Sequence, residues 1–101
     1  MATFVVLGNW TEQGVKGYAE STARARANEA AAAAMGGRIV ATYWTLGQYD
    51  FVTIVDAPDD TSMAIGNLIA AQRGTARTET LRAFTMDEMD GIIARVKAAV
   101  G

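Results

Sequence analysis

The chain has 101 residues, the size of one ordinary domain, with eleven acidic and nine basic residues and a formal net charge of −2. The two signs are interspersed, which argues against nucleic-acid or anionic-membrane binding. Because the chain contains neither cysteine nor histidine, disulfides, thiolate and imidazole metal ligands and a Ser-His-Asp relay are excluded, and we expect one domain over residues 1–101 without metal or cofactor.

The first predicted element is a strand over Phe4–Trp10, which is rich in β-forming residues and ends at a turn over Thr11–Gly14. No positively charged leader precedes this strand, and its apolar run is too short for a signal peptide or a membrane span. A cytoplasmic protein without a membrane partner is therefore expected.

An alanine-dominated helix is predicted over residues 21–35, with Ser21 or Thr22 as its N-cap and Gly36-Gly37 as a left-handed C-cap. Its apolar stripe consists of small side chains only: Ala23, Ala27, Ala30, Ala31 and Ala34. Such a helix either packs close to a sheet or leaves room above it, where a small apolar or aromatic ligand would fit.

A hairpin follows, with strands over Arg38–Leu46 and Tyr49–Asp56. Gly47 is suited to the first central position of a two-residue type II′ turn, because that position requires a positive φ. This turn predicts one face with the pairs Leu46/Tyr49, Trp44/Phe51, Thr42/Thr53 and Val40/Val55. It predicts the other face with Thr45/Asp50, Tyr43/Val52 and Ala41/Ile54.

Both faces of this hairpin are largely apolar, whereas a sheet with one face in water normally alternates apolar and polar residues. We therefore expect helices to cover one face and a second copy of the chain to cover the other, as in a dimeric α+β barrel. The alternative is a monomer with a partly apolar surface.

The remaining elements are a helix over Thr61–Arg73, a strand over Ala76–Phe84 and a final helix opened by the capping box Thr85–Glu88. Asp59 and Asp60 offer a carboxylate cap to the first of these helices. The apolar stripe of the final helix is formed by Met89, Ile92, Ile93, Val96 and Val100.

The predicted order is βαββαβ with an added C-terminal helix, which is the ferredoxin-like arrangement of an α+β fold. Its four-stranded antiparallel sheet has the first and third strands inside and the second and fourth at the edges. Charged residues in the fourth strand and at the start of the second agree with edge positions.

Five blocks of sequence carry a resemblance that covers nearly the whole chain. They are Phe4–Leu7 with the Thr11-x-x-Gly14 turn, Gly36-Gly37, Tyr43–Asp50, Ala57–Asp60 and Arg77–Thr85. In these blocks the chain resembles the GYD domain proteins, small bacterial proteins of largely unassigned function. The resemblance implies a ferredoxin-like domain of the dimeric α+β barrel kind, and it carries no catalytic residues.

Two residues after the hairpin turn are weak candidates for catalysis. Asp50 would serve as a general base if it were desolvated, and Tyr49 is its neighbour. A carboxylate beside a turn is more often satisfied by backbone N–H groups or by a hydroxyl, here that of Thr45.

Four residues are candidates for ligand binding: Asn9, Trp44, Tyr49 and Arg82. Each also has a structural interpretation. Trp44 packs with Phe51 in the core or an interface, or it forms a pocket wall. Asn9 orients a carbonyl or forms a turn at a strand end. Arg82 holds an anionic ligand or, as is more usual for a strand arginine, forms an ion pair.

Two classes of site lack a sequence signal. The acidic pairs Asp59-Asp60 and Asp87-Glu88 each stand at a helix start, where capping explains them without a metal. The glycines form no phosphate-binding motif after a strand.

The preferred function is a homo-oligomeric module that binds a small apolar or aromatic molecule or acts in assembly. The alternative is a cofactor-independent enzyme, an isomerase, cyclase or monooxygenase acting on an aromatic or polyketide-like compound, which rests on analogy of fold. A third possibility is a larger homo-oligomer built by pairing of edge strands.

Overall fold

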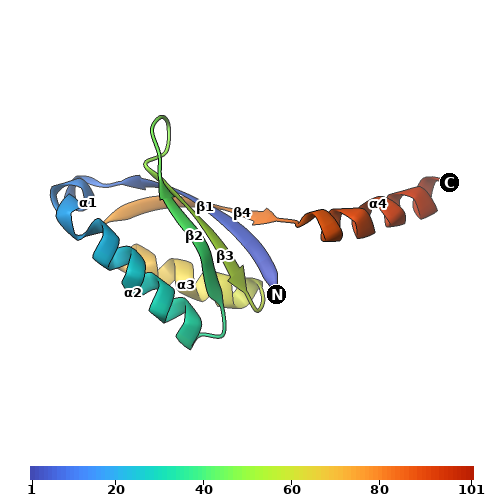
Figure 1. Ribbon diagram of the computed structural model, residues 1–101, viewed down its shortest axis with the longest axis horizontal. Coiled ribbons are helices and arrows are strands. Elements are labelled where there is room, and N and C mark those ends of the chain that lie inside the picture. Colours follow the sequence, from blue (N-terminus) through green and yellow to red (C-terminus); the bar gives the residue numbers. More distant parts are fainter.

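The computed structural model describes all 101 residues and has an α+β architecture (Figure 1). The elements are β1 Ala2–Trp10, α1 Glu12–Lys16, a 3₁₀ turn at Tyr18–Glu20, α2 Ser21–Ala34, β2 Arg38–Trp44, β3 Phe51–Ala57, α3 Asp60–Gln72, β4 Ala76–Ala83 and α4 Met86–Val100. This order agrees with a ferredoxin-like βαββαβ unit followed by a C-terminal helix.

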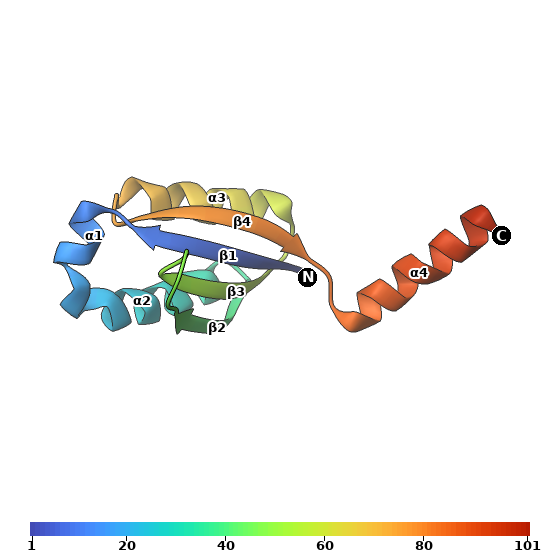
Figure 2. The same ribbon diagram turned by 90° about the horizontal axis from the view of Figure 1, so that it is seen from above.

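The four strands form one antiparallel sheet in the order β2-β3-β1-β4. The prediction that the first and third strands are central and the other two are edges is therefore confirmed. Helices α2 and α3 lie on the same face of this sheet, which we call the helix face, and the opposite face is the open face (Figures 1 and 2).

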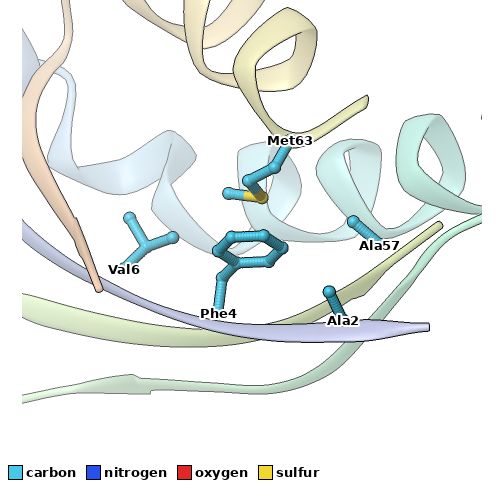
Figure 3. Close-up of a cluster of buried hydrophobic side chains, with 5 residues drawn as sticks. All are labelled: Ala2, Phe4, Val6, Ala57 and Met63. Atoms are coloured by element: carbon cyan, nitrogen blue, oxygen red, sulfur yellow. The ribbon is translucent and has the colours of Figure 1, made fainter. Parts of the chain in front are cut away.

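The core lies on the helix face, between β1 and α3. Alternate residues of β1 are buried, as expected for a central strand. Phe4 and Val6 of β1 point toward Met63 of α3, and Ala2 and Ala57 complete the cluster (Figure 3). Only 7 of the 101 residues are buried, so the isolated chain has a small core.

The predicted turn after β1 is wrong, because Thr11 caps a short helix instead. Its hydroxyl accepts a hydrogen bond from the N–H of Gly14 at 3.1 Å and donates one to the carbonyl of Gly74 at 2.6 Å. The predicted N-cap of α2 is also wrong. The 3₁₀ turn leads directly into α2, and the Ser21 hydroxyl donates to the carbonyl of Tyr18 at 2.7 Å.

The predicted left-handed C-cap of α2 is confirmed at Gly36, which has a φ of +80°. The N–H of Gly37 donates to the carbonyl of Ala32 at 2.9 Å, and the N–H of Gly36 donates to that of Ala33 at 3.1 Å. These two bonds form a Schellman motif, which satisfies carbonyls at the helix end.

The loop of the hairpin is longer than the predicted two-residue turn, since β2 ends at Trp44 and β3 begins at Phe51. Gly47 has a positive φ of +113°, as predicted. The loop is closed by a bond from Thr45 N–H to the Asp50 carbonyl at 2.9 Å and by a bond from the Thr45 hydroxyl to the Tyr49 carbonyl at 2.6 Å. These bonds replace the expected pairing of Leu46 with Tyr49.

The predicted register holds from Trp44/Phe51 to Ala41/Ile54 and then shifts by one residue. A β-bulge leaves Val40 unpaired, so Ile39 rather than Val40 lies opposite Val55. The bulge turns Ile39 toward the helices and leaves Val40 46% exposed.

Helix α4 projects away from the rest of the molecule (Figures 1 and 2). Its predicted capping box is confirmed: Thr85 Oγ1 accepts from the N–H of Glu88 at 3.1 Å, and the Glu88 carboxylate accepts from the N–H of Thr85 at 2.9 Å. No residue of α4 is buried. None of the helices combines the length and apolar character that crossing a bilayer requires.

The projecting helix makes the chain more extended than a compact domain. Its radius of gyration is 15.7 Å, against about 13 Å for a globular domain of this length. Its accessible surface is 6947 Å², against about 5,500 Å² for a compact monomer of this mass.

Candidate functional site

The largest cavity lies between the helix face of the sheet and helices α2 and α3, and has a volume of about 270 Å³. The sheet contributes Val6, Trp10, Trp44, Phe51 and Val55 to its wall. The helices contribute alanines, Met63 and Ile69 together with polar residues, among them Arg24, Asn28 and Asn67.

Of the two outcomes that the sequence left open for the alanine-rich helix, close packing or room above the sheet, the second is present. The predicted stripe of the helix is wrong: Ala23, Ala27, Ala30 and Ala34 are exposed, and of that stripe only Ala31 lines the cavity. The helix is turned so that Arg24, Ala25, Asn28 and Ala32 face the sheet instead.

Two features create this space: the small side chains of α2 and the glycine of β1 that lies under the ring of Phe51. Alanines such as Ala25 and Ala32 face the cavity from α2, and they have no long side chains to fill it. On β1, the ring of Phe51 lies over Gly8, where a Cβ atom would stand 2.0 Å from the ring carbon Cζ. The missing side chain at Gly8 lets the ring lie close to the sheet, so it lines the cavity without filling it.

Polar side chains bridge the elements around the cavity. Arg73, which ends α3, donates a hydrogen bond at 2.6 Å to the Oδ1 of Asn28 on α2. Asn67 of α3 donates at 3.2 Å to the hydroxyl of Thr80 on β4. Sequence reasoning missed Arg73 and Asn28 as neighbours, because 45 residues separate them.

The four predicted ligand-binding residues do not form one site. Trp44 lines the cavity and is 43% exposed. Asn9 of β1 lies opposite Arg77 of β4, and the strand register places both residues on the open face. Tyr49 reaches Glu79 on that same face, and Arg82 lies at the far end of β4.

The phenol of Tyr49 donates a hydrogen bond to Glu79 Oε2 at 2.9 Å. This bond raises the pKa of Tyr49 above its ordinary value, and desolvation and the carboxylate charge act in the same direction. A raised pKa keeps the phenol protonated at neutral pH, so the environment of Tyr49 does not favour a phenolate base.

Asp50 connects the hairpin loop to β1. Its Oδ2 accepts a hydrogen bond from the N–H of Trp10 at 2.9 Å, and its own N–H donates to the carbonyl of Gly8 at 2.8 Å. The carboxylate is thus satisfied by a backbone N–H group, which is the structural alternative that the sequence offered.

Arg82 is engaged within the chain. Its guanidinium lies 4.6 Å from the ring centroid of Phe84 and 5.6 Å from that of Phe4, and it forms an ion pair of 3.8 Å with Glu88. It also donates to the carbonyls of Thr3 and Ala83. These contacts join β4 to the start of α4.

The acidic residues at the helix starts act as caps. Asp59 Oδ1 accepts from the N–H of Ser62 at 2.7 Å, and this bond lowers the pKa of Asp59. The bond from the N–H of Thr85 is the main cause that lowers the pKa of Glu88. Both carboxylates are accounted for by capping.

The open face of the sheet carries a second set of apolar side chains, at positions that alternate with those of the helix face. These are Val5, Leu7, Tyr43, Val52, Ile54 and Leu81. Polar residues flank them: Tyr49 and Glu79 stand at one end, and Arg38 forms an ion pair of 3.3 Å with Asp56 at the other. No helix of the same chain covers this face (Figure 2).

Comparison with known proteins gives one family and a curated relative. A family model described as GYD domain matches residues 4–93. A protein of Thermus thermophilus named "Glutamine synthetase and cystathionine beta-lyase binding protein" is 37% identical over 98 residues, which cover 96% of this chain and 100% of that protein. No solved structure matches the chain.

Proposed function

The chain belongs to the GYD domain family, and from this membership and its uncovered apolar surfaces we propose that it is a small self-associating module that binds another protein. The observation that carries the proposal is the combination of an apolar open face with a projecting helix of which no apolar residue is buried. Two such surfaces in one small chain exceed what a monomer normally exposes.

The exposed area supports self-association. The chain exposes about 1,400 Å² more surface than a compact monomer of its mass. A stable interface of standard size removes about 800 Å² from each partner. One interface on the open face together with packing of α4 would account for this excess.

The open face suits a second copy, because its apolar centre lies between polar ends. In a two-fold pairing the same patch meets itself, so apolar residues meet apolar residues and the charged ends lie at the rim. This is the arrangement of the dimeric α+β barrel that the sequence predicted.

The charges along helix α4 favour its packing against the same helix of a second copy. Asp87, Glu88 and Asp90 lie in its first half, and Arg95 and Lys97 lie in its second half. Two α4 helices packed antiparallel through their apolar stripes would place the acidic half of each beside the basic half of the other.

Binding to another protein is proposed from the relative's name. That protein is named for binding glutamine synthetase and cystathionine β-lyase, and the similarity covers 96% of this chain and the whole of that protein. We propose that this chain likewise binds a metabolic enzyme, with these two enzymes as the first candidates.

Self-association is tested by light scattering with two variants, Tyr43→Asp on the open face and Ile93→Asp on α4. We expect the wild-type chain to form a dimer or a larger oligomer, and each variant to form an oligomer of fewer copies or a monomer. Matched controls are Leu68→Asp, since Leu68 is 70% exposed on α3, and Ala94→Asp, which lies opposite the α4 stripe. A wild-type monomer at micromolar concentration would reject self-association, and oligomers that survive both variants would indicate edge-strand pairing instead.

Partner binding is tested separately by isothermal titration calorimetry with purified glutamine synthetase and cystathionine β-lyase from the same organism. We expect at least one of them to bind with a defined stoichiometry, and an unrelated enzyme of similar charge to give no heat. If neither enzyme binds, the proposal about these partners is wrong, whatever the oligomeric state.

A further inference from the structure

The cavity between α2 and α3 carries unbalanced positive charge. Arg24 and Arg73 both line it, and neither takes part in the three ion pairs of the chain. The one acidic residue of the wall is Asp56, and its carboxylate lies on the open face, where it is bound to Arg38 at 3.3 Å and to the Thr3 hydroxyl at 2.9 Å.

Both arginines stand near Asn28 of α2. Arg24 and Asn28 are separated by one turn on α2, so their side chains are neighbours on the helix surface. Arg73 is bound to that same Asn28 at 2.6 Å. The two arginines therefore flank Asn28 where the start of α2 faces the end of α3.

Both arginines keep free donors. Arg73 uses Nη1 for its bond to Asn28, and Arg24 donates from Nη1 to the carbonyl of Gly17 at 3.1 Å and from Nη2 to the Ser21 hydroxyl at 3.5 Å. A guanidinium has five N–H donors, so each retains capacity for an anion. If Arg73 served only to connect the helices, a neutral side chain would do the same.

Apolar and aromatic side chains form much of the remaining wall, together with hydroxyl and amide side chains such as Thr42, Thr53 and Asn67. Trp10, Trp44 and Phe51 line the cavity together with Val6 and Met63. Its volume of about 270 Å³ exceeds the 150 Å³ or so that is enough to hold benzene in an apolar protein cavity. One ring with a short side chain therefore fits.

We propose that this cavity binds a small carboxylate with a single aromatic or branched apolar body, the carboxylate being held by Arg24 and Arg73 and the body by Trp44 and Phe51. Guanidinium groups match carboxylates in geometry and charge, and aromatic walls match an apolar ring. This ligand site goes beyond the proposed protein-binding role and is tested independently of it.

The test uses the intrinsic fluorescence of the full chain, since its two tryptophans, Trp10 and Trp44, both line the cavity. The probe is 3-phenylpropionate, and its neutral isostere 3-phenylpropionamide is the matched control ligand. We expect the acid to shift the fluorescence saturably and to bind about tenfold or more tightly than the amide.

Two variants identify the anion site. Arg73→Gln and Arg24→Gln are each expected to weaken binding of the acid about tenfold and to leave binding of the amide unchanged, whereas Arg95→Gln on α4 leaves both unchanged. Arg24→Gln does not remove the bond between Arg73 and Asn28, so it separates ligand binding from helix packing. Equal binding of acid and amide, unaltered affinity in both variants, or no binding of the acid at millimolar concentration would overturn the proposal.

Discussion

Strand β1 and helix α4 both have a regular apolar pattern, but only β1 is covered by its own chain. Every second residue from Ala2 to Gly8 is buried, and Phe4 is 6% exposed. On α4, Met89, Ile93 and Val96 are between 41% and 54% exposed although they form one stripe. The difference shows that an apolar pattern predicts the element and its covered side, but not which molecule provides the cover.

The largest effect is expected from removing the ring of Phe4. Phe4→Ala should lower the free energy of unfolding by about 3–5 kcal/mol, because it leaves a cavity next to Met63 in the only core. Urea denaturation at a protein concentration too low for self-association measures this loss.

The matched variant on α4 is Val96→Ala, which should change the free energy of unfolding of the monomer by no more than about 0.5 kcal/mol. Repeating both measurements at high concentration sharpens the comparison, since a covered α4 would make Val96→Ala destabilising as well. A large effect of Val96→Ala in the monomer would show that α4 packs on its own chain.

A smaller effect is expected from two glycines inside helices. A Cβ atom at Gly66 of α3 or Gly91 of α4 would contact nothing within 4 Å. Gly66→Ala should raise the free energy of unfolding by about 0.5–1 kcal/mol, because alanine loses less backbone entropy than glycine.

Gly91→Ala should increase helicity by circular dichroism without moving the urea midpoint of the monomer, because α4 lies apart from the core. If it stabilises the monomer as much as Gly66→Ala does, the two helices unfold together and the contrast between them is wrong.

The smallest effect is expected from lowering the pH, which protonates the Glu88 carboxylate at the start of α4. The Thr85 N–H, which donates to the Glu88 carboxylate, holds the pKa of Glu88 below its ordinary value of 4.5. A lowered pKa in the folded helix means that ionised Glu88 stabilises α4 above pH 4.5, and this contribution is lost as the pH falls through the lowered value.

Circular dichroism of the wild type and of Glu88→Gln separates this effect from other carboxylates, Asp59 among them. The wild type should lose more helicity in acid than the variant. Identical acid titrations of the two chains would mean that the ionised carboxylate of Glu88 does not stabilise α4.

Much of the fold was predictable from local patterns. The order of strands and long helices, the left-handed Gly36, the capping box at Thr85 and most of the hairpin register are confirmed. Each depends on residues close together in the chain. The predictions at Thr11 and Val40 were wrong because contacts with other segments decide the structure there. The Thr11 hydroxyl donates to the carbonyl of Gly74, and the pairing of β2 with β3 shifts by one residue at Val40.

The candidate site was less predictable. The alanine-rich helix allowed either close packing or room above the sheet, and Trp44 was interpreted either as a packing residue or as a pocket wall. The arginines of the cavity carry no local signal, because what brings both of them to its wall is the approach of the start of α2 to the end of α3.

By itself the sequence determined the family, the α+β order and which residues of each element are apolar, since these follow from local propensity, capping and period. The tertiary structure alone decided that Arg24 and Arg73 line the same cavity, that Asp50 is held by β1 and that α4 leaves the body. The physical reason is that contacts between distant segments depend on how far apart the packed layers stand. That spacing is set by the small side chains of α2 and by the ring of Phe51 over Gly8.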